Sequence, residues 1–114
     1  MKKDLVFVLP EVNSKEDVID FLVEKINDKG YIDSKKEFLQ GILDREKIGD
    51  TSWENGVAIP HFIGDVVKTS FISLLYIKGD GVKWSEENPP VNLIFLICMS
   101  KSNRAMSILR RLHL

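Results

Sequence analysis

Two histidines, His61 and His113, could act as nucleophiles or proton carriers near neutral pH in this 114-residue chain. His61 follows a short apolar run and stands directly after Pro60. Because a proline fixes its own φ and restricts the residue before it, the backbone that approaches His61 is stiff. The apolar run predicts a strand, and the ends of strands are where α/β sheets place reactive groups. We therefore expect His61 to carry chemistry.

Arg45 is the residue best suited to assist such a histidine. A neutral imidazole nitrogen can attack phosphorus, and the protein must then offset the negative charge of the phosphoryl oxygens. Arginine does this well, because its planar guanidinium matches a phosphate and stays charged. Arg45 falls at the end of a predicted helix, just before the polar loop that leads to His61. The alternative is that Arg45 is an exposed partner of Asp44 or Glu46 at a helix end.

The other reactive side chains give weaker signals. Cys98 lies in an apolar run, where a free cysteine acts as a small hydrophobic residue. The acidic residues are scattered, without the spacing of a carboxylate pair or a metal site. Residues 79–81 predict a turn, and the chain has no glycine-rich phosphate loop. We therefore expect no metal and no cofactor, and a free kinase or phosphatase is disfavoured.

Composition narrows the class of protein. The 16 basic and 17 acidic residues leave a net charge of -1, which argues against a nucleic-acid-binding protein. A single cysteine excludes an internal disulfide. The N-terminal apolar run is broken at Pro10, and the chain shows neither a signal peptide nor a membrane-spanning stretch. The sequence predicts one soluble, cytoplasmic domain with a modest core.

Hydrophobic periodicity predicts an α/β fold. The predicted strands cover residues 5–9, 56–61, 69–77, 82–84 and 91–99, the last of them buried on both faces. The predicted helices run from residues 13–16 to Gly30, from residues 34–37 through Arg45, and from Ser102 onward. With helices at both ends of a strand-rich middle, this order indicates a sheet covered by helices on its faces.

One stretch of the chain resembles the signature of a known protein family. Residues 43–61 contain Arg-Glu-Lys, then a threonine, then Asn-Gly-Val-Ala-Ile-Pro-His. This is similar to the pattern REK…T…NG(I/V)AIPH of the type-2 EIIA domains of the bacterial sugar phosphotransferase system, the fructose/mannitol family. Residues 81–84 and 90–95 match later parts of the family pattern. The resemblance covers almost the whole chain, so we expect residues 1–114 to form a single EIIA type-2 domain.

The resemblance implies a fold, a reaction and its partners. The family fold is a three-layer α/β/α arrangement with a mixed sheet flanked by helices. By this resemblance His61 accepts a phosphoryl group from the phosphohistidine of the carrier HPr, and Arg45 stabilises that group. The group then passes to a cysteine of an EIIB domain for sugar uptake, and the membrane is reached only through the EIIC transporter. Phosphoryl transfer depends mainly on positioning and charge compensation, for which one histidine and one arginine suffice.

The chain departs from the family pattern in three places. Phe62 follows His61 where the family usually has glycine. Ala105 stands where many members carry a second histidine, and His113 is too far along to replace it. The chain stops at Leu114 whereas relatives continue, so we expect C-terminal elements to be missing and an apolar face to be exposed.

Two other functions stay open. The chain could be a regulatory EIIA-like module, in which phosphorylation of the same histidine controls transcription or metabolism. It could also be a non-catalytic interaction domain with a vestigial His61. Retention of Arg45, Asn55 and Gly56 argues against a vestigial site, whereas the absent second histidine argues for it.

Overall fold

The computed structural model describes residues 3–101 and residue 111. In chain order its elements are the 3-10 helix η1 (Lys3–Leu5), strand β1 (Val6–Leu9), helices α1 (Lys15–Asp28) and α2 (Lys35–Ile48), and strands β2 (Val57–Ala58), β3 (His61–Ile63), β4 (Phe71–Ile77) and β5 (Leu93–Met99). The predicted strands at residues 5–9, 69–77 and 91–99 and the first two predicted helices are confirmed, with small differences at their ends.

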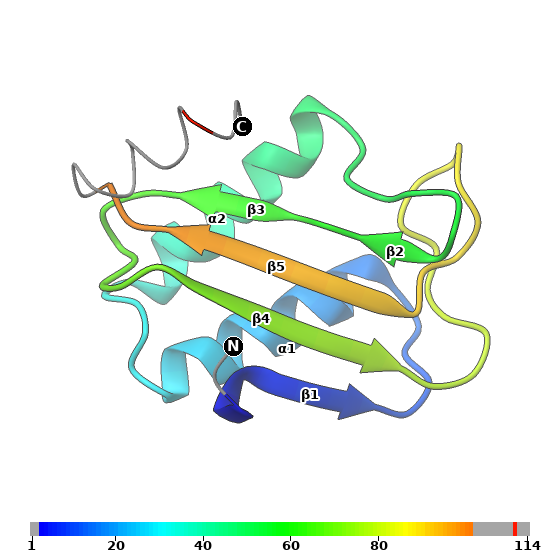
Figure 1. The fold of residues 1–114 in the computed structure, drawn as a ribbon, viewed down its shortest axis with the longest axis horizontal. Helices are drawn as coiled ribbons and strands as arrows, with labels where there is room; N and C mark the ends of the chain where they lie inside the picture. Colours follow the sequence, from blue (N-terminus) through cyan, green and yellow to red (C-terminus); the bar gives the residue numbers. More distant parts are fainter. Residues whose placement is uncertain (1–2, 102–110, 112–114) are drawn as a thin grey trace.

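The strands form one mixed sheet in which β5 is central (Figure 1). On one side β5 pairs antiparallel with β4, and β1 completes that side by pairing parallel with β4. On its other side β5 pairs parallel with β2 and β3, which lie end to end along the same edge. The α/β class and the mixed sheet expected from the sequence are therefore confirmed.

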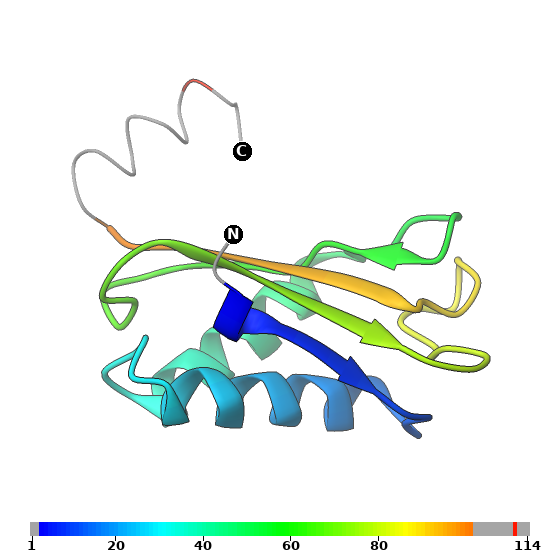
Figure 2. The same cartoon turned by 60° about the horizontal axis from the view of Figure 1, so that its bottom comes forward.

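Helices α1 and α2 lie side by side and cover one face of the sheet (Figure 2). Each begins after a serine whose hydroxyl accepts a backbone N–H three residues further on: Ser14 from Asp17 at 3.1 Å and Ser34 from Glu37 at 3.2 Å. These caps are the helix-start signals of the sequence. The predicted helix from Ser102 onward, which would supply the other helix layer, lies outside the described residues except for residue 111.

The two faces of the sheet differ in exposure. On β4, alternate residues from Phe71 to Ile77 are buried against the helices, whereas Ile72 and Tyr76 are exposed on the other face. Val6 and Val8 of the neighbouring β1 are exposed as well. β5 buries every second side chain fully and the others partly, so the expectation that it is buried on both faces is confirmed for one face and holds only in part for the other. Apolar side chains are thus exposed on the face of β1 and β4 that points away from α1 and α2.

The predicted strand at residues 82–84 is also wrong. Val82 forms a single bridge with Val91, exchanging backbone hydrogen bonds of 2.9 and 2.8 Å. The chain then turns Trp84 inward, where the side chain is 4% exposed and its Nε1 donates two hydrogen bonds. A buried indole needs a partner for its N–H. Trp84 finds its partners in Glu46 and Thr51, so the segment does not continue along the sheet.

Phe62 docks the edge of the sheet onto α2. Its ring meets the ring of Phe38 with centroids 5.0 Å apart and planes at 67°. The ring also lies against Gly64 and over Gly41 in the middle of α2: a Cβ at Gly64 would meet it at 2.7 Å, and a Cβ at Gly41 would come closer still. Glycine lowers helix stability, but at position 41 it leaves the room in which the ring sits.

This packing predicts a change of sign in a double-mutant cycle. In the wild type, Gly41→Ala should lower the free energy of unfolding by about 1–2 kcal/mol, because overpacking outweighs the better helix propensity of alanine. In a Phe62→Ala background the ring is gone, and the same substitution should raise the free energy of unfolding. Urea denaturation of the four proteins measures both effects. Equal destabilisation in the two backgrounds would contradict the contact.

Candidate functional site

His61 lies on an edge strand that is broken just before it. After β2, Ile59 turns its N–H away from β5 and donates to the Thr51 carbonyl at 2.9 Å. Pro60 has no N–H, but its carbonyl accepts from Ile97 at 3.0 Å, and β3 begins at His61. The prediction that His61 stands at the end of a strand is therefore wrong. His61 is the first residue of the next strand. Pro60 interrupts the edge without disrupting the sheet, because a proline is tolerated at a sheet edge.

A hairpin brings the polar loop of the sequence next to β2. Trp53 donates its backbone N–H to the Val57 carbonyl at 2.8 Å, and Ser52 forms a bridge with Ala58. The chain reverses at Gly56, whose φ of 82° lies in the left-handed region that glycine adopts without strain. This turn gives the Asn-Gly pair of the sequence motif its structural role.

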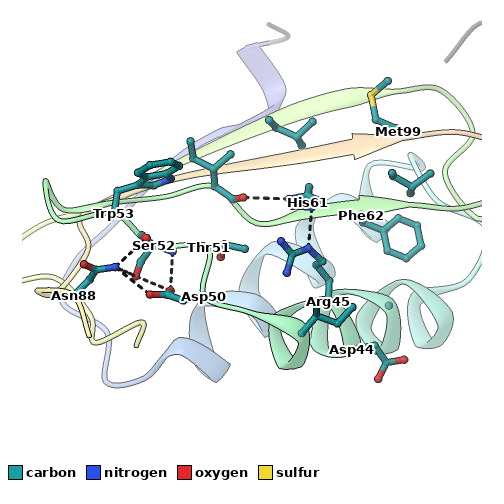
Figure 3. Close-up of a pocket in the computed structure, with 15 residues that line it drawn as sticks. Asp44, Arg45, Asp50, Thr51, Ser52, Trp53, His61, Phe62, Asn88 and Met99 are labelled. Atoms are coloured by element: carbon teal, nitrogen blue, oxygen red, sulfur yellow. Dashed lines mark hydrogen bonds between the residues drawn. The ribbon is translucent and has the colours of Figure 1, made fainter. Parts of the chain in front are cut away.

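Arg45 reaches His61 from the last turn of α2 (Figure 3). Its Nε donates a hydrogen bond of 2.8 Å to Nε2 of His61, and its Nη1 donates to the Gly49 carbonyl at 3.3 Å. Among the described residues Arg45 forms no ion pair with Asp44 or Glu46, because those carboxylates have other partners. The structure thus brings together the two residues that the sequence singled out.

The contacts of the imidazole define which nitrogen carries its hydrogen. An arginine Nε–H can only donate, so Nε2 of His61 accepts and is unprotonated. Nδ1 is then the protonated nitrogen, and it faces the carbonyl of Ile59 at 3.5 Å, a long hydrogen bond. The lone pair that can attack an electrophile is therefore on Nε2, next to the guanidinium.

Both side chains open into a pocket along the sheet edge (Figure 3). Its apolar wall is formed by Ile59, Phe62, Ile63, Ile97 and Met99. Asp50, Ser52 and Asn88 supply polar groups at one end, and Trp53 and Ile48 are 60% and 80% exposed beside it. A concave, largely apolar surface with a few converging polar groups is typical of a binding site.

Asp50 organises the polar end of the pocket. Its Oδ1 accepts from the backbone N–H and the hydroxyl of Ser52 at 2.8 and 2.7 Å, and its Oδ2 accepts from Asn88 at 3.0 Å. Burial alone would raise the pKa of Asp50, but hydrogen bonds from Ser85, Ser52 and Asn88 outweigh burial and lower the pKa below its ordinary value. Asp50 therefore ties the start of the hairpin to the segment around Asn88.

Glu46 is the residue of this region that sequence reasoning missed. It was one of the scattered acids, yet its side chain is only 6% exposed and its carboxylate accepts from Lys15, Thr51 and Trp84. Periodicity could not reveal this, because two of the three donors, Lys15 and Trp84, lie far from Glu46 in the chain. The available signal was its position directly after Arg45 in the sequence motif.

The remaining candidates lie away from the pocket or outside the described residues. Cys98 is fully buried, and desolvation raises the pKa of its thiol well above the ordinary value, which confirms its packing role. In residues 3–101 no group of histidine, cysteine and carboxylate side chains is arranged as a metal site. Neither described helix is long and apolar enough to cross a membrane. Ala105 and His113 are not among the described residues.

Comparison with known protein families identifies the family of this chain. The model of the family described as "Phosphoenolpyruvate-dependent sugar phosphotransferase system, EIIA 2" matches residues 1–113. The chain belongs to this family. The resemblance seen in the sequence motif is thereby confirmed, and the chain is an EIIA domain of type 2.

Two kinds of relative match this EIIA domain in sequence. It is 36% identical over 105 residues to the "Probable licABCH operon regulator" of Bacillus subtilis, covering 92% of this chain and 16% of that protein. It is 26% identical over 111 residues to the mannitol-specific EIICBA component of Escherichia coli, covering 94% of this chain and 17% of that protein. The EIIA domain therefore spans about a sixth of the length of these relatives.

Solved structures share the fold of this EIIA domain. The crystal structure of IIA mannitol from Escherichia coli matches with a TM-score of 0.75 and 25% identity, over 98% of this chain and 79% of that chain. The nitrogen regulatory protein IIA-Ntr from Neisseria meningitidis matches with a TM-score of 0.78 and 23% identity, over 92% and 71%. The mixed sheet with its two covering helices is thus the family fold.

The pKa of Asp50 predicts how the polar end of the pocket responds to acid. Because the folded state lowers this pKa below 3.8, the ionised carboxylate contributes stability above that value and loses it as pH falls through the folded pKa. Asp50→Asn should therefore lower the free energy of unfolding at pH 7, and the gap to wild type should shrink toward pH 3. Asp44→Asn, which removes an exposed carboxylate from the lining of the same pocket, is the control for the loss of one negative charge. A gap that stays constant between pH 7 and pH 3 would show that the prediction is wrong.

Proposed function

We propose that this EIIA domain is a phosphoryl carrier for sugar uptake, with His61 as the residue that carries the phosphoryl group. The observation that supports this most directly is the 2.8 Å contact between Nε2 of His61 and Nε of Arg45. It puts an unprotonated ring nitrogen and a permanent positive charge at one point of an open pocket. Transfer of an anionic group uses both, because the lone pair attacks and the cation balances charge.

In the proposed first step, the Nε2 lone pair attacks the phosphorus of a phosphohistidine on HPr. The new N–P bond forms as the donor N–P bond breaks, and the electron pair of the broken bond returns to the donor nitrogen. Nδ1 of His61 keeps its hydrogen and faces the Ile59 carbonyl, which stabilises the positive charge that develops on the ring. Because the transition state of phosphoryl transfer is loose, the alignment of the attacking and leaving nitrogens with phosphorus contributes most to the rate, together with charge stabilisation.

Arg45 changes partners during this step. At rest its Nε occupies the lone pair of Nε2, so the guanidinium must move aside as phosphorus approaches. The hydrogen bond from Nη1 to the Gly49 carbonyl, at 3.3 Å, keeps the group near the site while it moves. Its N–H groups then face the phosphoryl oxygens, for which the planar fork is well matched.

In the second step, a cysteine thiolate of an EIIB domain attacks the phosphorus, an S–P bond forms, and the N–P bond to His61 breaks. A match in fold supports this partner: the Escherichia coli IIAMTL domain, solved in a complex with phosphorylated IIBMTL, matches with a TM-score of 0.75 and 24% identity. The exposed side chains of Trp53 and Ile48 beside the pocket suit contact with a protein surface. The membrane is involved only indirectly, through the EIIC transporter.

A regulatory module is the second candidate function. Two relatives favour it, the "Probable licABCH operon regulator" and the transcriptional regulator ManR of Bacillus subtilis, at 36% and 29% identity. The proposed phosphorylation of His61 would be the same, and only the fate of the phosphoryl group would differ. The vestigial alternative is less well supported, because Arg45 and His61 are in direct contact.

The carrier function predicts a covalent product. Incubation with phosphoenolpyruvate, enzyme I and HPr should add one acid-labile phosphoryl group to the intact mass of the protein, and His61→Ala should prevent it. Subsequent addition of an EIIB domain should remove the group if the protein serves sugar uptake and leave it in place if the protein is a regulator. A folded wild-type protein that gains no mass from active donors would refute phosphoryl transfer.

The role of Arg45 predicts a graded loss of rate. Arg45→Ala should slow phosphorylation of His61 by about a hundredfold, as expected for removal of one charged donor from a transition state. Arg45→Lys should slow it less, because it keeps the charge but loses the planar fork. Lys47→Ala removes a 76% exposed cation two residues later and should leave the rate unchanged. Stopped-flow or quenched mass spectrometry follows the reaction; equal rates for Arg45→Ala and Lys47→Ala would rule the role out.

A further inference from the structure

Glu46 carries a buried charge at the end of α2. Its side chain is 6% exposed, and its two carboxylate oxygens have different partners. Oε1 accepts from Lys15 Nζ at 2.7 Å and from Trp84 Nε1 at 3.0 Å, and Oε2 accepts from the Thr51 hydroxyl at 2.8 Å. Every contact is within normal hydrogen-bond distance, so the desolvated carboxylate is well compensated.

The donors to Glu46 come from three separate parts of the fold. Lys15 is the first residue of α1, Thr51 begins the hairpin, and Trp84 lies in the segment between β4 and β5. They also contact one another: Lys15 Nζ lies 4.9 Å from the centre of the Trp84 ring, and Trp84 Nε1 donates to the Thr51 hydroxyl at 3.0 Å. The four side chains therefore form one closed cluster around a single carboxylate.

A line of hydrogen bonds leads from this cluster to the imidazole. Glu46 and Trp84 fix the side chain of Thr51, whose carbonyl accepts the N–H of Ile59 at 2.9 Å. The carbonyl of Ile59 in turn faces Nδ1 of His61 at 3.5 Å. This last contact is the longest, and such contacts tighten when charge develops on the ring. The orientation of the Ile59 carbonyl, and with it the ring, thus depends on where Thr51 is held.

We propose that Glu46 is a positioning residue for His61, acting through Thr51 and Ile59. The proposal rests on the proposed function, because positioning matters only if Nε2 of His61 is the nucleophile. Glu46 also follows Arg45 directly on the same helical turn. The carboxylate therefore anchors the end of α2 that supplies the guanidinium and the hairpin that orients the imidazole. The positions of both Arg45 and His61 therefore depend on one buried carboxylate.

A purely structural role makes a different prediction. Buried ion pairs can often be replaced by apolar residues with little loss of stability, so stability alone does not explain a carboxylate here. If the cluster serves only packing, near-isosteric changes in it should alter stability and leave the state of the imidazole as it was. If it positions His61, the ring should report the change in a protein that is still folded. The imidazole signals are therefore the decisive readout.

The first measurement uses protein labelled with 15N-histidine in a His113→Gln background, so that His61 supplies the imidazole signals. Glu46→Gln and Thr51→Val are the test variants, since each keeps the shape of the side chain and removes part of the cluster. Glu24→Gln is the matched control, because it removes one carboxylate from an exposed ion pair with Lys35. Far-ultraviolet circular dichroism and thermal melts establish that each protein is folded.

The expected result is a displaced Nδ1 resonance and faster exchange of its hydrogen with water in both test variants, with neither change in Glu24→Gln. Unaltered Nδ1 signals in folded Glu46→Gln and Thr51→Val would overturn the proposal. This readout needs no phosphoryl donor. It therefore separates the positioning of the ring from the question of whether the domain is phosphorylated at all.

The second measurement is single-turnover phosphorylation by phospho-HPr. Glu46→Gln and Thr51→Val should lower the maximal rate about tenfold and leave the donor concentration at half-maximal rate unchanged, since misplacement of a reacting group affects the chemical step. A wild-type rate in both variants would overturn the positioning role while leaving the carrier function intact. Failure of the wild type itself to be phosphorylated would instead refute the carrier function.

Discussion

The imidazole of His61 must be held at both of its nitrogens by groups that belong to different elements. Nε2 accepts from Arg45 on α2, and Nδ1 faces a carbonyl of the chain that leads into β3. The contact with Arg45 exists only if the last turn of α2 and the broken sheet edge keep a constant separation, whereas the contact with Ile59 depends on the path of the chain just before His61. Much of the packing around the site can be understood as the means by which that separation is maintained.

Two contacts maintain it on either side of the Arg45 side chain. On one side, the Phe62 ring sits in the space that Gly41 leaves on α2, so that β3 packs against the helix in one position. On the other side, Glu46 draws the hairpin and the indole of Trp84 to the helix end by charge and hydrogen bonds. Phe62 is therefore compatible with the site although it is bulky, because its ring points to α2 and not toward the open part of the pocket.

The same site suits either a transport component or a regulator. The relatives in sequence include both, and this domain spans about a sixth of the length of each. In the proposed reaction, His61, Arg45 and the groups that position them determine whether a phosphoryl group can be accepted. The fate of the accepted group depends on the surface that next meets the pocket, and the domain's own chemistry does not distinguish those partners.

The first two helices, the main strands and the two residues at the centre of the site could be predicted from the sequence alone. Serine caps, 3.6-residue periodicity and apolar runs are local signals, and the motif that ends in Ile59, Pro60 and His61 is contiguous. Three other features depend on the folded chain: a strand begins at His61, Trp84 turns away from the sheet, and the carboxylate of Glu46 is buried. Each depends on hydrogen-bond partners far away in the chain. A buried polar group must satisfy its hydrogen bonds wherever the fold supplies them, and no local pattern records where that is.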